Sequence, residues 1–589
     1  MSTFWRLLGF LRPFRAGVGW SLLLAGAATG GTIAIPALTG AAVDAIQRSD
    51  AGDVRMYGLA IAGAGLFRWV LSVARRLVAG RVSLGVELLL RQRVYDHLQS
   101  LELAFFDRQQ TGQLMSRATV DLQSVRFFLG YGLVWILQAG LTIAFTGIAM
   151  VVLDPVLAAI ALSPVPFVVW VSARYGRRSR PALQEVQQRI AELTANAEED
   201  IGGVRVVKSF AQEARRYANF EHSVGRVFEQ AMVSTRLQAF YNPLIAFLPQ
   251  IGLALLLVVG GRAVIDGRTS LGDFTAFYAY LLALLGPMRS LGISLGLAQR
   301  ATASGARLFQ VLDRVPELTA PEGAPPLPAG AGDVRLDHVS LRYADARAEA
   351  LSDVTLHVRA GTTLALVGGT GSGKTTLVAL LARLYDVTEG SVRIDGADVR
   401  EVDLRSLHRA IAIVDDNPFL FSASVRDNIA YARPDATDEE IETAARRAQA
   451  HDFISRLPDG YATRIGERGL TLSGGQRQRV AIARALVADP RILILDDATS
   501  SVDASTEQQI RSALAEAMAG RTTFVIAHRL STIALADEIA VLEGGRLVAR
   551  GTHDELLETD SLYREIVEKG LPDQVFLTRK APERQAAGL

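Results

Sequence analysis

The chain has 589 residues, 49% of them hydrophobic, with a formal net charge of +1 and no cysteine. Its positive mean hydropathy is too high for one soluble domain of this size, and its length predicts more than two structural units. The near-zero charge argues against a nucleic-acid-binding protein, and the lack of cysteine excludes disulfides and thiolate metal sites.

The N-terminal segment predicts an amphipathic helix on the membrane surface. Arg6, Arg12 and Arg15 are interspersed with apolar residues such as Trp5 and Phe10. This mixture is typical of an interfacial helix and not of a cleavable signal peptide. We therefore expect the segment to remain attached to the protein.

Six apolar stretches follow, and each is long enough to span a bilayer, for which about 20 residues suffice. They cover approximately residues 16–43, 56–79, 131–152, 155–173, 241–261 and 274–297. Basic segments before the first span and after the fourth predict cytoplasmic N- and C-termini by the positive-inside rule. Asp154 and Pro155 predict a tight outer hairpin between the third and fourth spans.

Two arginines lie inside these apolar stretches, Arg68 in the second and Arg289 in the sixth. Intramembrane charges commonly line a polar pathway, so both are candidate contacts for an anionic or amphipathic substrate. The alternatives are snorkelling from a helix end and an ion pair.

Two long polar segments interrupt the apolar half, at about residues 91–126 and 174–236. Their helical periodicity predicts membrane helices that continue into the cytoplasm, either as solvated hairpins or as arms that contact another domain. We expect a membrane domain over residues 1–320, a Pro/Gly/Ala-rich linker over 321–332, an α/β domain with a parallel sheet over 333–570, and a tail over 571–589.

The α/β domain contains the strongest chemical signal, LALVGGTGSGKTTL. It fits a P-loop placed between an apolar strand and a helix, in which backbone amides and the helix N-terminus surround phosphate oxygens. We expect Lys374 to reach the terminal phosphates of ATP and Thr375 to bind Mg²⁺. The candidate nucleotide-binding residues of this loop are Gly368, Gly371, Ser372, Gly373, Lys374, Thr375 and Thr376.

A second phosphate-site element is the strand ILILD, which ends at Asp496. An apolar strand that delivers a carboxylate in this way predicts a Mg²⁺ ligand, bound directly or through water.

The sequence LSGGQ at Leu472–Gln476, together with the P-loop, Asp496 and His528, resembles the ATP-binding cassette proteins. Six spans ahead of one cassette resemble that superfamily's half-transporter exporters. The segments FFDRQQTGQLMSR and GGVRVVKSFAQE are similar to its cytoplasmic loops, whose short coupling helices dock on the cassettes. The resemblance implies two cassettes facing head to tail, with each ATP between one P-loop and the other chain's Ser473, Gly474, Gly475 and Gln476. Closure around ATP and reopening after hydrolysis would then switch the spans between inward-open and outward-open states.

The same resemblance implies roles for several further residues. Tyr343 corresponds to an aromatic residue that stacks on adenine, and His528 to a histidine that contacts the γ-phosphate. Ser500–Asp503 corresponds to a loop that signals between the two sites, and TRIGERG to a segment that contacts the partner's coupling helices.

Two positions depart from the family pattern. Asp416 stands where a glutamine is common, and as a carboxylate it could still bind Mg²⁺. Asp497 stands in the place of the catalytic glutamate, and its shorter side chain predicts slow hydrolysis. These departures beside an intact LSGGQ suggest the degenerate half of a heterodimer, although aspartate could also act as the base after a small backbone shift.

The expected function is ATP-driven export of a lipophilic, drug-like, lipid or peptide substrate by a multi-pass protein in the plasma membrane, most simply a bacterial inner membrane. Its expected partners are a second half-transporter, membrane lipids and the transported molecule, but no nucleic acid. The alternatives are an importer with the same fold, for example for a siderophore, and a soluble cassette protein if the spans do not insert. The sequence does not identify the substrate.

Overall fold

The computed structural model describes residues 3–344, 346–466, 469, 471–496, 504–527 and 530–569. They form two compact units. Within the described residues, the first consists of residues 3–99 and 111–314, and the second of residues 100–110 and those between 315 and 569.

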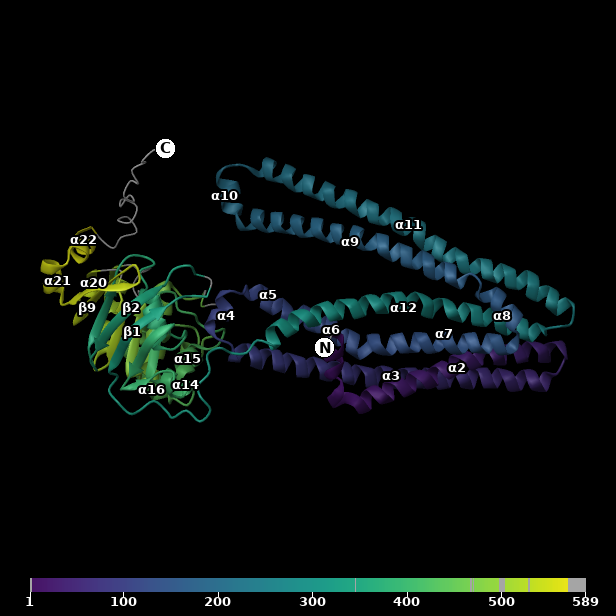
Figure 1. Ribbon diagram of the computed structural model, residues 1–589, viewed down its shortest axis with the longest axis horizontal. Helices are drawn as coiled ribbons and strands as arrows, with labels where there is room; N and C mark the ends of the chain where they lie inside the picture. Colours follow the sequence, from purple (N-terminus) through teal and green to yellow (C-terminus); the bar gives the residue numbers. More distant parts are fainter. Residues whose placement is uncertain are drawn as a thin grey trace, which may run out of the picture. The chain divides into compact units, whose positions relative to one another are not determined.

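The first unit is helical (Figure 1). Its elements are α1 (Thr3–Gly9), η1 (Arg12–Phe14), α2 (Arg15–Gln47), α3 (Ala51–Ser100), α5 (Thr111–Ser116), the π-helical η2 (Arg117–Asp121), α6 (Leu122–Phe127), the π-helical η3 (Phe128–Gly132), α7 (Leu133–Leu153), α8 (Pro155–Leu162), α9 (Val165–Gly202), α10 (Val204–Ser209), α11 (Glu213–Ile265) and α12 (Leu271–Leu312). Among the described residues, six helical segments are long and apolar enough to cross a membrane, which confirms the six predicted spans.

The predicted hairpin between the third and fourth spans forms at Asp154. Helix α7 ends at Leu153 and α8 begins at Pro155. The Asp154 carboxylate accepts hydrogen bonds from the amides of Val156 and Leu157, at 2.8 and 3.0 Å. This cap satisfies two amides at the start of α8, where proline cannot donate one.

Helix α12 contacts both α2 and α7. Its N-terminus approaches α2 closely enough for the Gly272 amide to donate to Asp44 Oδ1 at 2.6 Å. A Cβ atom on Gly40 would lie 2.5 Å from the Gly272 carbonyl oxygen, so this crossing requires glycine. Further along α12, Arg307 Nε donates to the buried carboxylate of Asp121 at 2.8 Å.

The N-terminal helix packs against protein, which membrane-surface amphipathicity alone did not predict. Leu7 is fully buried in a cluster with residues of α3, α6 and α12. Arg6 donates to Asp313 at 2.7 Å, and the Phe10 ring stacks on Phe309. The Leu7 side of α1 is therefore packed against protein, whereas Trp5 of the same helix is 62% exposed.

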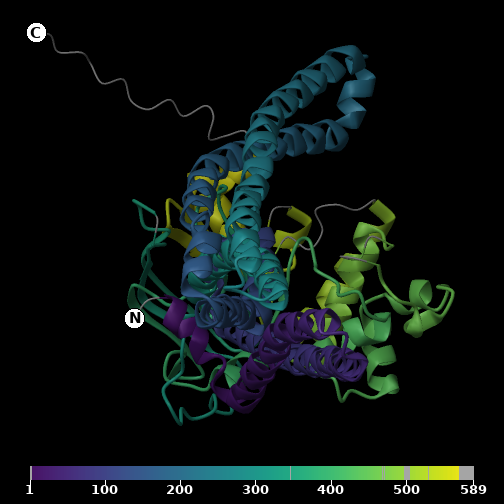
Figure 2. The same cartoon turned by 90° about the vertical axis from the view of Figure 1, so that its right-hand side faces the viewer.

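Helices α9 and α11 run side by side as a long hairpin, with α10 at its tip (Figures 1 and 2). This hairpin corresponds to the predicted polar segment at residues 174–236. Figure 2 shows its tip standing away from α2 and α3 in the same unit.

The second unit contains two sheets. Their strands are β1 (Val334–Leu341), β2 (Leu351–Val358), β3 (Thr363–Val367), β4 (Glu389–Ile394), β5 (Ala397–Asp398), β6 (Ile411–Val414), β7 (Ile492–Asp496), β8 (Thr522–Ile526), β9 (Glu538–Glu543) and β10 (Arg546–Gly551). The antiparallel sheet has the order β2-β1-β4-β5, and the larger sheet has the order β10-β9-β3-β8-β7-β6. In the larger sheet β9, β3, β8, β7 and β6 are parallel, and β10 pairs antiparallel with β9.

The helices of this unit are α4 (Leu103–Asp107), α13 (Lys374–Leu381), α14 (Leu404–Ala410), α15 (Val425–Ile429), η4 (Ala430–Ala432), α16 (Asp438–Arg447), α17 (His451–Ile454), η5 (Gly460–Ala462), α18 (Gly474–Ala488), α19 (Ala504–Met518), α20 (Leu530–Ile533), α21 (His553–Thr559) and α22 (Ser561–Lys569). Strand β3 is buried on both faces: Leu364 and Leu366 lie in one core and Ala365 and Val367 in the other. Burial on both faces explains its uninterrupted apolar sequence.

Candidate nucleotide-binding site

The candidate site lies where three neighbouring parallel strands end. Leu366 of β3 is in register with Ile526 of β8, which is in turn in register with Asp496 of β7. The P-loop begins at Gly368, two residues beyond this row. Because adjacent strands lie about 4.8 Å apart, the ends of β3 and β7 are separated by about 10 Å. The edge therefore brings together two sequence motifs that are more than one hundred residues apart in the chain.

The P-loop has the backbone conformation that its glycines permit. Gly368, Gly371 and Gly373 have φ values of 155°, 78° and 99°. A Cβ atom at Gly368 would collide with the carbonyl oxygen of Leu542, and one at Gly373 would lie 2.7 Å from the Ala350 carbonyl oxygen. At Gly368 and Gly373 glycine is required both for the backbone conformation and for space, and at Gly371 for the backbone conformation alone.

Lys374 is the first residue of α13 and is only 5% exposed. Its Nζ donates to the carbonyl oxygens of Gly368 and Gly369, each at 2.9 Å. The loop thus curls around the ammonium group of its own lysine. Ser372 is buried beside it, whereas Thr375 and Gly371 are exposed.

Tyr343 follows β1 and reaches the P-loop helix. Its hydroxyl lies 3.0 Å from the Thr376 hydroxyl, and its ring meets the edge of Tyr385 with centroids 5.1 Å apart. A cavity of about 480 Å³ lies against both tyrosines. The structure therefore places the predicted adenine-stacking residue beside the P-loop.

Tyr385 is a residue that sequence analysis did not identify. Its hydroxyl donates to the carboxylate of Asp107 in α4, which belongs to the same compact unit. Burial and the adjacent carboxylate of Asp107 raise the pKa of Tyr385, so the hydroxyl stays protonated and remains a donor. The sequence FFDRQQTGQ predicted a coupling helix near α4, but nothing in the sequence LLARLYD predicted that Tyr385 would contact this helix.

The LSGGQ motif forms the start of α18. Ser473 is the N-cap, and its hydroxyl accepts from the Gln476 amide while Gln476 Oε1 accepts from the Ser473 amide at 2.9 Å. Gly474 and Gly475 are the first two helical residues. A helix start with this cap presents its remaining amides and positive dipole end to an anion.

Helix α18 also holds the segment that follows β6. Gln478 donates to the Asp415 carbonyl oxygen at 3.1 Å, and Arg484 donates to the Phe419 carbonyl oxygen at 3.1 Å. Burial of the Asp415 carboxyl group and the neighbouring charge of Asp416 raise the pKa of Asp415. Val414 is in register with Leu495, so Asp416 follows β6 at the same sheet edge as Asp496.

Several predicted residues lie outside the described part of the chain. They are Asp497, His528 and the Ser500–Asp503 loop, together with two residues of TRIGERG, Glu467 and Arg468. The side chain of Arg289 is also outside the described part.

Two arginines of the second span differ in burial. Arg68 of α3 is exposed in the single chain. Arg75, seven residues further along the same helix, is 8% exposed, and its Nε has no hydrogen-bond partner among the described residues. Arg75 is therefore the more deeply buried of the two charges, although the sequence did not mark it as a candidate substrate contact.

The available oxygens fit Mg²⁺ that arrives with a nucleotide. Among the described residues, no group of three or more His, Cys, Asp or Glu could hold a metal ion. Magnesium commonly binds one or two protein oxygens together with substrate phosphates, and it would neutralise phosphate charge here. Thr375, the second residue of α13, supplies a hydroxyl, and Asp496, the last residue of β7, supplies a carboxylate, which is the donor set for this mode of binding.

Two family models match the chain. The ABC transporter transmembrane region matches residues 18–288, and the ABC transporter model matches residues 351–500. The matched regions contain the six-span part and the P-loop with Asp496, respectively.

Known relatives match the whole length. An uncharacterized ABC transporter ATP-binding protein of Bacillus subtilis is 36% identical over 567 residues, covering 96% of this chain and 97% of that protein. A multidrug efflux ATP-binding/permease protein of Mycobacterium tuberculosis is 38% identical over 595 residues, covering 100% of this chain and 49% of that protein. The solved structure of a bacterial Atm1-family ABC exporter with ATP bound has a TM-score of 0.78 and 31% identity, covering 97% of this chain and 99% of that one.

Proposed function

The chain belongs to the ATP-binding cassette exporters, and we propose that two half-transporters of this kind, this chain and a partner, export a lipophilic or amphipathic small molecule. The observation that carries this proposal is the convergence of the P-loop and Asp496 at one sheet edge in a chain with six candidate spans. The protein is a multi-pass membrane protein of the bacterial inner-membrane type, and we propose that both termini lie in the cytoplasm.

The P-loop residues would bind ATP through backbone amides and charge. Lys374 would exchange its two carbonyl contacts for phosphate oxygens, and the α13 N-terminus would face the same anion. Thr375, Asp496 and Asp416 are the proposed oxygen ligands of Mg²⁺. Tyr343, held beside Thr376, would stack on adenine.

The proposed site is completed by a second cassette. The capped start of α18 has an exposed Ser473, followed by Gly474 and Gly475. Such a helix start can bind the γ-phosphate of an ATP held on the partner's P-loop. The M. tuberculosis relative, of which this chain covers 49%, supports an assembly with two such halves.

The tip of the α9–α11 hairpin is the proposed contact with the partner's cassette. Ile201, Val206 and Phe210 are 74%, 60% and 71% exposed at this tip. An exposed apolar group of this kind marks a protein interaction site. Docking would connect cassette closure to movement of α9 and α11.

Replacing Phe210 with Asp should uncouple transport from ATP hydrolysis. Loss of a buried aromatic anchor and burial of a charge cost about 2–4 kcal/mol at an interface, or roughly 100-fold in docking equilibrium. We expect ATP-driven transport in proteoliposomes to fall by at least about tenfold. Phe228→Asp is the matched control, because Phe228 is 65% exposed on α11 but lies away from the tip. Equal losses in both variants would contradict the docking role of α10.

Export itself is tested by direction in sealed vesicles. The chain and its partner, reconstituted with cassettes outside, should accumulate fluorescent amphipathic substrates in the lumen only when Mg-ATP is added outside. ATP-dependent release of preloaded compound under the same conditions would indicate import and reject the proposal.

A further inference from the structure

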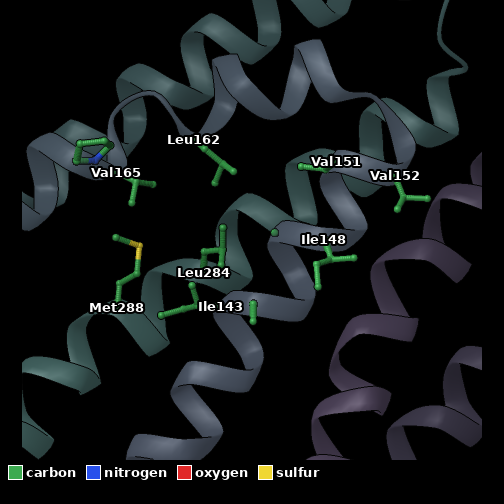
Figure 3. Close-up of a pocket in the computed structure, with 11 residues that line it drawn as sticks. Ile143, Ile148, Val151, Val152, Leu162, Val165, Leu284 and Met288 are labelled. Atoms are coloured by element: carbon green, nitrogen blue, oxygen red, sulfur yellow. The ribbon is translucent and has the colours of Figure 1, made fainter.

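An apolar cleft of about 630 Å³ lies within the membrane unit, between α7, α8, α9 and α12. None of its lining residues has a polar side chain. Figure 3 shows Leu162 and Val165 pointing from one wall toward Leu284 and Met288 on the other. The volume falls in the range of ligand-binding pockets, about 300–1,000 Å³.

Two local features keep the cleft open. The helical path breaks between α8 and α9 at Ser163 and Pro164, and the Ser163 hydroxyl donates to the Ile160 carbonyl oxygen at 2.8 Å. Opposite this break, α7 contributes Gly147, where an added Cβ would meet nothing within 4 Å. The cleft therefore lies between a helix break whose serine hydroxyl is hydrogen-bonded and a glycine that has no side chain to fill the space.

The cleft extends through about one leaflet of a bilayer. Val152 lies next to the end of α7 at Leu153, whereas Ile143 lies ten residues inside that end. Ten helical residues span about 15 Å. This is half of the hydrocarbon core, which is about 30 Å thick. All three helical runs that form the walls are candidate membrane spans.

The chemistry of the walls selects the occupant. Water would find no hydrogen-bond partner there, and a polar group would lose its hydration without compensation. At this depth the abundant apolar chains are those of lipids, and the cleft is open and not an enclosed cavity, so it is accessible to a single chain. We infer that the cleft binds one acyl chain of a bilayer phospholipid, with the headgroup near the α7–α8 turn.

The inference is tested with a phospholipid that carries a diazirine in its acyl chain. The full transporter is placed in nanodiscs of phosphatidylethanolamine and phosphatidylglycerol, irradiated, and mapped by mass spectrometry. Adducts on Ile148, Val151 and Leu284 should exceed those on Leu257 of α11, which is 63% exposed and outside the cleft, by at least about fivefold. Equal labelling would show ordinary lipid contact and overturn the inference, as would cleft adducts to a second protein chain in place of lipid.

A second test of the inference fills the cleft with a larger side chain. Gly147→Phe should occupy the cleft and reduce its lipid adducts about tenfold, and Ala144→Leu tests the same wall with a smaller side chain. Gly140→Phe is the control, since Gly140 lies two turns earlier on nearly the same face of α7, has open space for a Cβ, and does not line the cleft. Unchanged cleft adducts in folded Gly147→Phe protein would also overturn the inference. The comparison with Leu257 in the unsubstituted protein remains decisive if neither filled variant folds.

Discussion

Replacing Lys374 with alanine is expected to reduce ATP binding and hydrolysis by this chain's P-loop about 100- to 1,000-fold. The ammonium group is buried inside the loop and is held by two carbonyl oxygens, so it is positioned before nucleotide arrives. Removing one preorganised donor from such a site costs about 2.7–4 kcal/mol. Binding of a fluorescent ATP analogue to this chain's site and phosphate release by the dimer would measure the two effects.

Arg409→Ala is a suitable control for this substitution. Arg409 is an exposed cation in the last turn of α14, so its removal changes the charge of the same cassette without touching the P-loop. Retention of nucleotide affinity by Lys374→Ala would contradict the assignment of Lys374 to the phosphates. A loss in both variants would indicate an effect of overall charge instead.

The sequence predicted the strand–loop–helix order of the P-loop because that motif is local. Glycine spacing, the apolar strand before it and the helix after it all lie within about twenty residues, and the structure has β3, the loop and α13 in that order. The six spans were predicted for the same reason, since each is a single apolar run. Local patterns of this kind carry their own structural information.

Contacts between distant segments were not predictable in this way. The insertion of β8 between β3 and β7 sets the separation of the P-loop from Asp496, and no local pattern specifies strand order. The Tyr385–Asp107 bond joins residues 278 positions apart. Similarly, the amphipathic pattern predicted α1 but did not show whether Leu7 packs against lipid or against α12.

Arginine burial illustrates a limit of hydropathy alone. Arg68 drew attention because it interrupts an apolar run, yet its side chain is exposed in the single chain. Arg75 lies nearer the end of that run and is buried. The two residues lie about two turns apart on nearly the same face of α3, so what packs beside each level of the helix, and not the hydropathy of the run, decides which charge is removed from solvent.

Converting Asp497 to glutamate should raise ATP turnover of the assembled transporter modestly, if this chain supplies the slow site of a heterodimer. Asp497 lies outside the described residues, so the proposal rests on its position directly after Asp496. The aspartate side chain is one C–C bond shorter than that of glutamate, so its carboxylate is withdrawn by about 1.5 Å. A misplacement of about 1 Å can cost roughly 100-fold in rate, which corresponds to about 2.7 kcal/mol of barrier. The gain would remain modest because Asp416 and the partner's signature motif also limit this site.

Turnover must be compared between the two sites to interpret that result. Mutation of the partner's catalytic glutamate should abolish most activity, whereas nucleotide should persist on this chain's P-loop after the partner's site has turned over. This chain purified alone should show little ATPase activity. A stable homodimer that hydrolyses ATP at about 1–10 per second, within the ordinary enzyme range, would show that Asp497 is a competent base. The heterodimer proposal would then fall, but the ATP-driven exporter assignment would not, because it rests on the spans and the sheet-edge site and not on the length of one carboxylate side chain.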